Sequence, residues 1–181
     1  MEEWVSTKES HKVYALEPGE YILHEEAAPE GYLVVSDVPS VVEETGEIQK
    51  VEIKDERPSG QLLIQKTDAE NKAPLADVEF ELRNQATGEI VETLVTGEDG
   101  TAKSGELPIG IYEEGAFVEP IVYVLVETKP LEGYEANTEE VEVVFEYQDD
   151  ETKIIEATEE IENARKPGTP PPDAPKTGDD T

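Results

Sequence analysis

The chain has 181 residues, no cysteine and a formal net charge of −31, which arises from 45 Asp and Glu against 14 Lys and Arg. A surface this acidic repels nucleic-acid phosphates and anionic lipid headgroups, so both are excluded as partners. The lack of cysteine excludes disulfides, thiolate catalysis and thiolate-bound metals, and the length predicts one or two small domains.

The N-terminal segment does not have the features of a secretory signal. Its first ten residues, MEEWVSTKES, are acidic and contain no apolar core. No stretch approaches the roughly 20 apolar residues of a membrane span. If the protein is exported, we expect its signal to lie upstream of this sequence.

Residues 1–57 are predicted to form a first unit made of β-strands. A Pro-Gly turn in LEPG precedes the strand YILHE, and the apolar segments LVV and VPSVV follow it. The unit ends in IQKVEIKDERP, in which Val51, Ile53 and Asp55 share one face. The sequence Pro58-Ser59-Gly60 has the composition of a linker.

Residues 58–165 show a fuller pattern of short strands. Lys66 alternates with Leu62 and Ile64 on one face of QLLIQK, and VEFELR alternates apolar and charged side chains. Turns in QATGEI, in GEDG and in the acidic QDDET separate further strands, and turns about every ten residues indicate an antiparallel sandwich or barrel. EATEEIENAR has the propensity of a short helix, but the alternation of Ile155, Ala157, Ile161 and Asn163 favours a strand.

The remaining residues, 166–181, contain five prolines and no core-forming side chain. Such a composition is typical of an extended, disordered linker.

A twelve-residue box with the pattern Y-x-L-x-E-x-x-x-x-E-G-Y occurs twice, at 21–32 and at 123–134. Tyr, Leu and Glu fall at alternate positions, so all three side chains point to one face of a strand. That face is otherwise apolar. Because burying a carboxylate is costly unless it is neutral or paired, Glu25 and Glu127 each require an explanation.

The two units are related but unequal. In the second unit, Lys66 lies upstream of the box, whereas the equivalent position of the first unit would fall before Met1. The first unit is therefore interpreted as lacking its leading strands. The second unit carries ten extra residues, 111–120, which we expect to form a loop with Ile111, Tyr112 and Phe117 partly exposed.

With these motifs in place, the chain resembles the B-type domain of the collagen adhesin, which occurs in Gram-positive surface proteins and pilins. The resemblance covers residues 60–165 and, less completely, about 4–57. It rests on IQKTD with Lys66, on the second box with Glu127 and on IENA with Asn163. One departure is Leu131, at the place where the family usually has the proline seen at Pro29.

This resemblance implies an immunoglobulin-like or prealbumin-like antiparallel Greek-key sandwich that contains a spontaneous isopeptide bond. Lys66 would be the nucleophile and Asn163 the acceptor, while Glu127 would polarise the Asn163 carbonyl and relay a proton. Strand parity independently places all three side chains in the core, where burial favours the neutral forms of Lys66 and Glu127. The alternative is a buried ion pair with a hydrogen bond. In the first unit, Glu25 and Asp55 would be the equivalents, without a lysine.

The tail also carries a motif that resembles the LPxTG sorting signal, with alanine in place of leucine. It consists of five consecutive residues: Ala174, Pro175, Lys176, Thr177 and Gly178. Sortase would cleave after Thr177 and join it to peptidoglycan. The hydrophobic span and basic tail that normally follow are absent from this sequence, and the alternative is a generic Pro/Thr linker.

These features predict a structural stalk of an extracellular, wall-anchored adhesin or minor pilin, which is not an enzyme and has no cofactor. Distal domains outside this sequence would bind a host or extracellular-matrix ligand. One alternative is a binding module that uses the 111–120 loop, and another is a spacer of a secreted enzyme. The acidic turn at 149–151 is expected to be solvated rather than to hold calcium, and His11 and His24 lack metal-ligand spacing.

Overall fold

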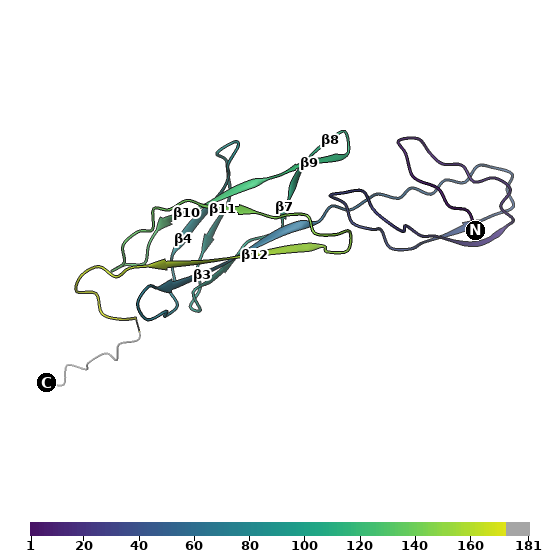
Figure 1. Cartoon of the computed structure of the whole chain (residues 1–181). Coiled ribbons are helices and arrows are strands. Elements are labelled where there is room, and N and C mark those ends of the chain that lie inside the picture. The colour runs from purple at the N-terminus through teal and green to yellow at the C-terminus, as the bar shows by residue number, and fades with distance from the viewer. Residues whose placement is uncertain (173–181) are drawn as a thin grey trace.

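The computed structural model describes residues 1–172, and these residues form β-strands and no helix. The molecule is elongated, with the first unit at one end and the last described residues, up to Pro172, at the other (Figure 1). The predicted all-β fold is confirmed. Among the residues described, no helix is long and apolar enough to cross a membrane.

The second unit is a sandwich of two sheets. One sheet has the order β11-β10-β4-β5 and consists of β4 (Glu79–Asn84), β5 (Ile90–Val95), β10 (Val122–Lys129) and β11 (Val141–Val144). The other has the order β12-β3-β6, with β3 (Ser59–Asp68), β6 (Thr101–Lys103) and β12 (Ile154–Asn163), and the short β7 (Leu107–Pro108) also pairs with β3. Residues 154–163, whose composition also has helical propensity, form a strand as expected.

One strand pair departs from the antiparallel expectation. β3 and β12 run parallel over ten residue pairs, from Ile154 opposite Ser59 to Asn163 opposite Asp68. β12 enters this sheet after a crossover from β11 in the opposite sheet, so no hairpin fixes its direction. The first and last strands of the unit are therefore neighbours, and polar side chains near their ends are brought together.

The core between the sheets is built from alternating residues. Every second side chain of β3 is buried, because side chains alternate between the two faces of a strand. The buried side chains are Leu62, Ile64, Lys66 and Asp68. The facing sheet contributes fully buried apolar side chains from three strands, among them Phe80, Leu82, Tyr123, Leu125 and Val143. An otherwise apolar core thus encloses a lysine.

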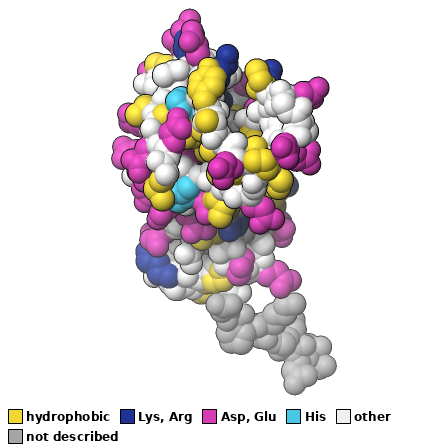
Figure 2. Space-filling model, turned by 90° about the vertical axis from the view of Figure 1, so that its right-hand side faces the viewer, with side chains coloured by type: hydrophobic (Ala, Val, Ile, Leu, Met, Phe, Trp, Pro, Cys, Tyr) yellow, Lys and Arg dark blue, Asp and Glu magenta, His cyan; other side chains and the backbone are white. Residues whose placement is uncertain are grey.

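The first unit is far less compact. It contains β1 (Gly19–Leu23) paired with β2 (Val38–Val42), and its only buried residues are Gly31, Tyr32 and Leu33. Ile22, Val41 and Ile48 are exposed, and Figure 2, which views this end of the molecule, shows hydrophobic side chains scattered among Asp and Glu. The segment 49–57 does not form the expected core-facing strand. Its backbone forms one isolated β-bridge, between Leu33 and Glu56, and no ladder, because no strand among residues 1–172 lies beside this segment.

Two sequence expectations about connecting segments were wrong. Residues 111–120 are not a loop but a hairpin of β8 (Gly110–Glu113) and β9 (Ala116–Pro120). Ser59 and Gly60 belong to β3 rather than to a linker, and Gly60 lies against the Phe145 ring. Of the tail, the structure describes residues 166–172, where the Thr169 side chain packs on Gly133. Each segment is fixed by partners distant in sequence, which local composition does not reveal.

Candidate functional site

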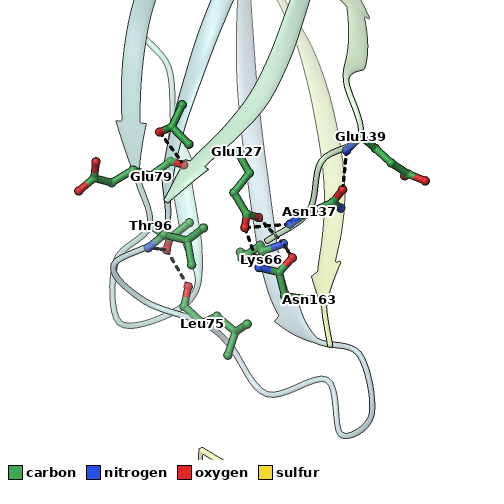
Figure 3. A network of polar contacts seen from close by, with 10 residues as sticks. Lys66, Leu75, Glu79, Thr96, Glu127, Asn137, Glu139 and Asn163 are labelled. Atoms are coloured by element: carbon green, nitrogen blue, oxygen red, sulfur yellow. Dashed lines mark hydrogen bonds and ion pairs between the residues drawn. The ribbon is translucent and has the colours of Figure 1, made fainter. Parts of the chain in front are cut away.

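Three polar side chains from three strands meet inside the second unit (Figure 3). Lys66 on β3 donates a hydrogen bond from Nζ to Asn163 Oδ1 on β12, over 2.6 Å. Asn163 Nδ2 donates to Glu127 Oε1 on β10, over 2.8 Å. Glu127 Oε2 lies 3.0 Å from Lys66 Nζ. The three groups therefore form a closed triangle of contacts.

This triangle is shielded from solvent. Lys66 is 0% exposed, Asn163 is 1% exposed and the Glu127 side chain is 1% exposed. The Phe80 ring closes one side, with its centroid 5.8 Å from Lys66 Nζ. Burial lowers the pKa of Lys66, and the close contact with the negatively charged Glu127 opposes this shift only in part. The site thus favours the neutral amine more than water does.

The backbone of Lys66 is held by the turn beneath it. Its N–H donates to Gly100 O over 2.8 Å, and its carbonyl accepts from Leu75 N over 3.0 Å. Gly100 has a φ of 73°, and a Cβ there would lie 2.5 Å from Lys66 O. Only glycine therefore allows this turn to approach Lys66 so closely. The sequence indicates a turn at Gly100, but it does not reveal that this turn contacts the backbone of Lys66.

The loop after the second box holds the carboxyl group of Glu127. The backbone N–H of Asn137 donates to Glu127 Oε1 over 3.2 Å, and the Asn137 side chain caps the N–H of Glu139 (Figure 3). Glu127 Oε1 thus accepts two hydrogen bonds, whereas the buried Oε2 receives no hydrogen bond of suitable angle. Oε2 is left facing the amine. No sequence pattern indicated that Asn137 has this role.

The orientation of the Asn163 amide differs from the expectation that Glu127 contacts its carbonyl. Glu127 Oε1 accepts from the amide nitrogen, and the carbonyl oxygen is contacted by Lys66 instead. This arrangement suits an amide between a donor and an acceptor. It places the carboxyl group beside the nitrogen that any attack on this amide would have to expel.

A second buried polar cluster adjoins the first. Asp68, two residues beyond Lys66 on the same face of β3, accepts a hydrogen bond from the Tyr134 hydroxyl over 2.8 Å, and the Arg165 guanidinium lies 2.8 Å away. Burial opposes ionisation of Asp68, but Tyr134, the backbone N–H groups of Asn71 and Glu70 and the Arg165 charge together hold its pKa below the usual value. Burial and the hydrogen bond to Asp68 raise the pKa of Tyr134 to about 12. This cluster locks the end of the box to the C-terminal ends of both β3 and β12.

The first-unit equivalents are not brought together. Glu25 Oε2 accepts a hydrogen bond from Val35 N over 2.7 Å, and Asp55 is exposed. Within residues 1–172 no hydrogen bond or ion pair joins Glu25 to Asp55. A lysine of the first unit, Lys8, instead lies 3.4 Å from Glu114 on the surface. The first unit therefore has no counterpart of the triangle.

The five residues 174–178 of the sorting motif lie outside the described part of the chain. Asp149 Oδ1 accepts from the backbone N–H groups of Glu151 and Thr152, so this carboxylate closes the turn. Across residues 1–172, no group of three or more His, Cys, Asp or Glu side chains is arranged to hold a metal ion.

Comparison with known proteins identifies the family of this fold. A model of the SpaA prealbumin-like fold domain matches residues 1–57 and again residues 60–114, which together make up more than half of the chain. The chain belongs to this family. Its sandwich is therefore a SpaA-type prealbumin-like domain. No curated protein matches the chain.

Solved structures with a related fold come from Gram-positive bacteria. The TIE protein of Bacillus anthracis has 29% sequence identity and a TM-score of 0.57 over 83% of this chain. The major pilins SpaA and SpaD of Corynebacterium diphtheriae have 22% and 23% identity over 77% and 60% of this chain, each with a TM-score of 0.47. This SpaA-type chain spans 26% of the TIE protein, 41% of the SpaA pilin and 32% of the SpaD pilin.

Proposed function

We propose that this chain is a structural stalk segment of a surface adhesin or minor pilin, and that its second unit crosslinks itself through an isopeptide bond between Lys66 and Asn163. The observation that carries the proposal is the position of Glu127. Its Oε2 lies 3.0 Å from the amine nitrogen of Lys66, and its Oε1 lies 2.8 Å from the amide nitrogen of Asn163. A single carboxyl group thus bridges the nucleophile and the leaving group.

The reaction is an exchange of one amide for another. Lys66 passes a proton to Glu127 Oε2 and becomes a neutral amine, whose Nζ attacks Asn163 Cγ. The N–C bond that forms gives a tetrahedral intermediate, and Glu127 transfers a proton to Nδ2. The Cγ–Nδ2 bond then breaks and ammonia leaves, and the excess proton on Nζ passes to this ammonia, so that Nζ ends as a neutral amide N–H. Glu127 ends as it began, and the protein loses one molecule of ammonia.

Folding supplies the remaining requirements. The strands hold amine and amide in direct contact, so the attack is intramolecular and its entropic cost is already met. Burial lowers the pKa of Lys66, which increases the fraction of neutral amine, and it keeps out water that would compete as nucleophile. The same triangle without reaction would be a buried ion pair, which contributes little to stability.

The experiment that tests the crosslink is the intact mass of the full chain. The parent protein is expected to be one ammonia lighter than its sequence, and Glu127→Gln is expected to have the full sequence mass because it cannot accept the proton. Glu25→Gln, at the same place in the first box, is the matched control and should keep the mass loss. A parent of full sequence mass would contradict the proposal.

The stalk role includes an anchored C-terminus. We propose that the protein is extracellular and that sortase joins Thr177 to peptidoglycan. The position of the motif after a proline-rich segment supports this, and the elongated shape places the last described residues, which precede the motif, far from the first unit (Figure 1). Incubation with sortase and a glycine nucleophile should yield a product ending at Thr177, whereas Thr177→Ala should not react. Cleavage elsewhere, or none in the parent, would contradict anchoring at this motif.

A further inference from the structure

The hairpin β8–β9 is a regular element of the second unit that contributes no residue to the Lys66–Glu127–Asn163 triangle. It occupies the place where the first unit has only Glu20, and its turn at Glu114 and Gly115 has positive φ at both residues, as in the tightest two-residue hairpins. Tyr112 and Phe117 pair across its strands, with ring centroids 5.6 Å apart. These two aromatic side chains are half-buried although the hairpin lies outside the core.

What covers them is the end of the first box. The Tyr112 hydroxyl donates to Gly31 O over 2.5 Å, and the Tyr32 hydroxyl donates to Gly115 O over 2.6 Å. Gly31 has a φ of 84°, and a Cβ there would lie 2.6 Å from Phe117 Cβ. The turn and the hairpin therefore fit each other through two reciprocal hydrogen bonds and one close contact that requires glycine.

Further contacts surround this pair. The Arg57 guanidinium lies 3.8 Å from the centroid of the Tyr112 ring, and the Tyr147 hydroxyl donates to Tyr32 O over 3.0 Å. Val34 N donates to Asp150 O over 2.8 Å. Tyr32 and Leu33 are the only buried apolar side chains of the first 57 residues. The best-packed part of the first unit is thus its contact with the second.

The glycine at the end of the second box is likewise covered by a side chain from outside its unit. A Cβ on Gly133 would lie 2.7 Å from Thr169 Cγ2, and Gly133 O accepts from Thr169 Oγ1 over 2.9 Å. Gly31 and Gly133 occupy the same position of the repeat. In both cases a residue from outside the unit packs on this glycine, and a hydroxyl from outside the unit donates a hydrogen bond to its carbonyl.

We propose that the E-G-Y turn at the end of each box is a docking face, and that the β8–β9 hairpin is a clamp that grips this turn of the preceding unit and joins the two units into one stiff rod. The partner of the hairpin is thus residues 29–32 rather than an external ligand. This proposal does not depend on the Lys66–Asn163 crosslink. It gives the aromatic residues of the hairpin a function that a ligand-binding loop would leave unexplained.

The test measures the distance between the units in the full chain. Because the chain has no cysteine, Val41→Cys and Val95→Cys, both on exposed strand positions, give two unique sites for spin labels. Double electron–electron resonance between the two spin labels should give one narrow distance peak for the protein that carries no other substitution. The clamp variant Tyr112→Ala/Phe117→Ala should lose this peak, whereas Ile111→Ala, an exposed residue of the same hairpin, should keep it.

A second pair of variants tests the docking face from the first unit. Gly31→Ala should lose the narrow peak, whereas Gly46→Ala, with a φ of 69° and no atom within 4 Å of its Cβ, should keep it. The intact mass of each variant shows separately whether the second unit has crosslinked. A broad distribution in the unchanged protein, a narrow peak in the clamp variants or broadening in the controls would overturn the proposal.

Discussion

Two glutamates occupy the same position of the same twelve-residue box, and their surroundings differ completely. Glu127 lies between the amine of Lys66 and the amide of Asn163, with its side chain 1% exposed. Glu25 is half-buried and accepts a hydrogen bond from the backbone of Val35. The difference comes from the facing sheet, because only the second unit has a lysine-bearing strand there against which its box can pack. The chemistry therefore belongs to the triangle rather than to the box.

The neighbouring Asp68 cluster leads to a prediction about acid stability. Tyr134→Phe removes a hydrogen bond to a buried carboxylate and is expected to cost about 1–3 kcal/mol in the free energy of unfolding at neutral pH. Because the folded state holds the pKa of Asp68 below its usual value, this contribution is present above the unfolded pKa of about 4 and is lost as pH falls through the folded value.

The measurement is calorimetric unfolding of the parent and of Tyr134→Phe between pH 7 and pH 2. The difference between the two proteins should be constant in the upper part of this range and shrink in the lower part. Tyr14→Phe, at a residue that is 77% exposed, should match the parent throughout. A difference that does not change with pH would show that Tyr134 does not stabilise the ionised form of Asp68.

At the scale of elements, β3 organises the second unit. It pairs with β12 along its whole length and also with β6 and β7, and its inward face carries both Lys66 and Asp68. The turn before β6 supports it from below through Gly100. The placement of Lys66 thus depends on a turn more than thirty positions away along the chain.

Two glycine substitutions distinguish the effect of the close contact between Gly100 and Lys66 from the effect of a positive φ alone. Gly100 and Gly88 have φ values of 73° and 72°, but a Cβ on Gly100 would lie 2.5 Å from Lys66 O, whereas Gly88 has open space. Gly100→Ala should therefore destabilise the second unit by about 1–3 kcal/mol more than Gly88→Ala, because β3 must shift. It should also lower the fraction of chains that lose ammonia. Equal effects of the two substitutions on unfolding temperature and on mass would contradict this account.

The sequence predicted the parts of the structure that depend on local alternation. Lys66, Glu127 and Asn163 each share parity with apolar neighbours, so their inward direction could be derived, and the strand at 154–163 followed from the same argument. The parallel pairing of β3 with β12 and the hairpin at 111–120 depend on contacts between distant segments. Asn137 and Gly100 act through backbone groups and close approach, which residue type alone does not reveal.

For the whole molecule, the position of the crosslink decides how force passes through the chain. Tension enters the second unit where β3 begins and leaves where β12 ends, so it would shear the parallel pair. A bond between Lys66 and Asn163 would carry that load directly and bypass a loop of 97 residues. By analogy with a disulfide closing a loop of this length, it would also stabilise the fold by about 4–5 kcal/mol.

Single-molecule pulling tests this path. The parent should show no lengthening step from the second unit, since the loop carries no load. Glu127→Gln should show one step of about 330 Å, because 97 residues extend at roughly 3.4 Å each. Glu25→Gln should behave as the parent. A step of this length in the parent would show that force still passes through the loop.

The most direct test of the central claim is a tryptic peptide map of the parent protein. A Lys66–Asn163 bond blocks cleavage after Lys66, so residues 55–72 and 154–165 should appear as one branched peptide, lighter by one ammonia than the two linear peptides together. Fragmentation should place the branch at Lys66 and Asn163, and the peptide should be absent from Glu127→Gln. Recovery of only linear peptides, with cleavage after Lys66, would contradict the account.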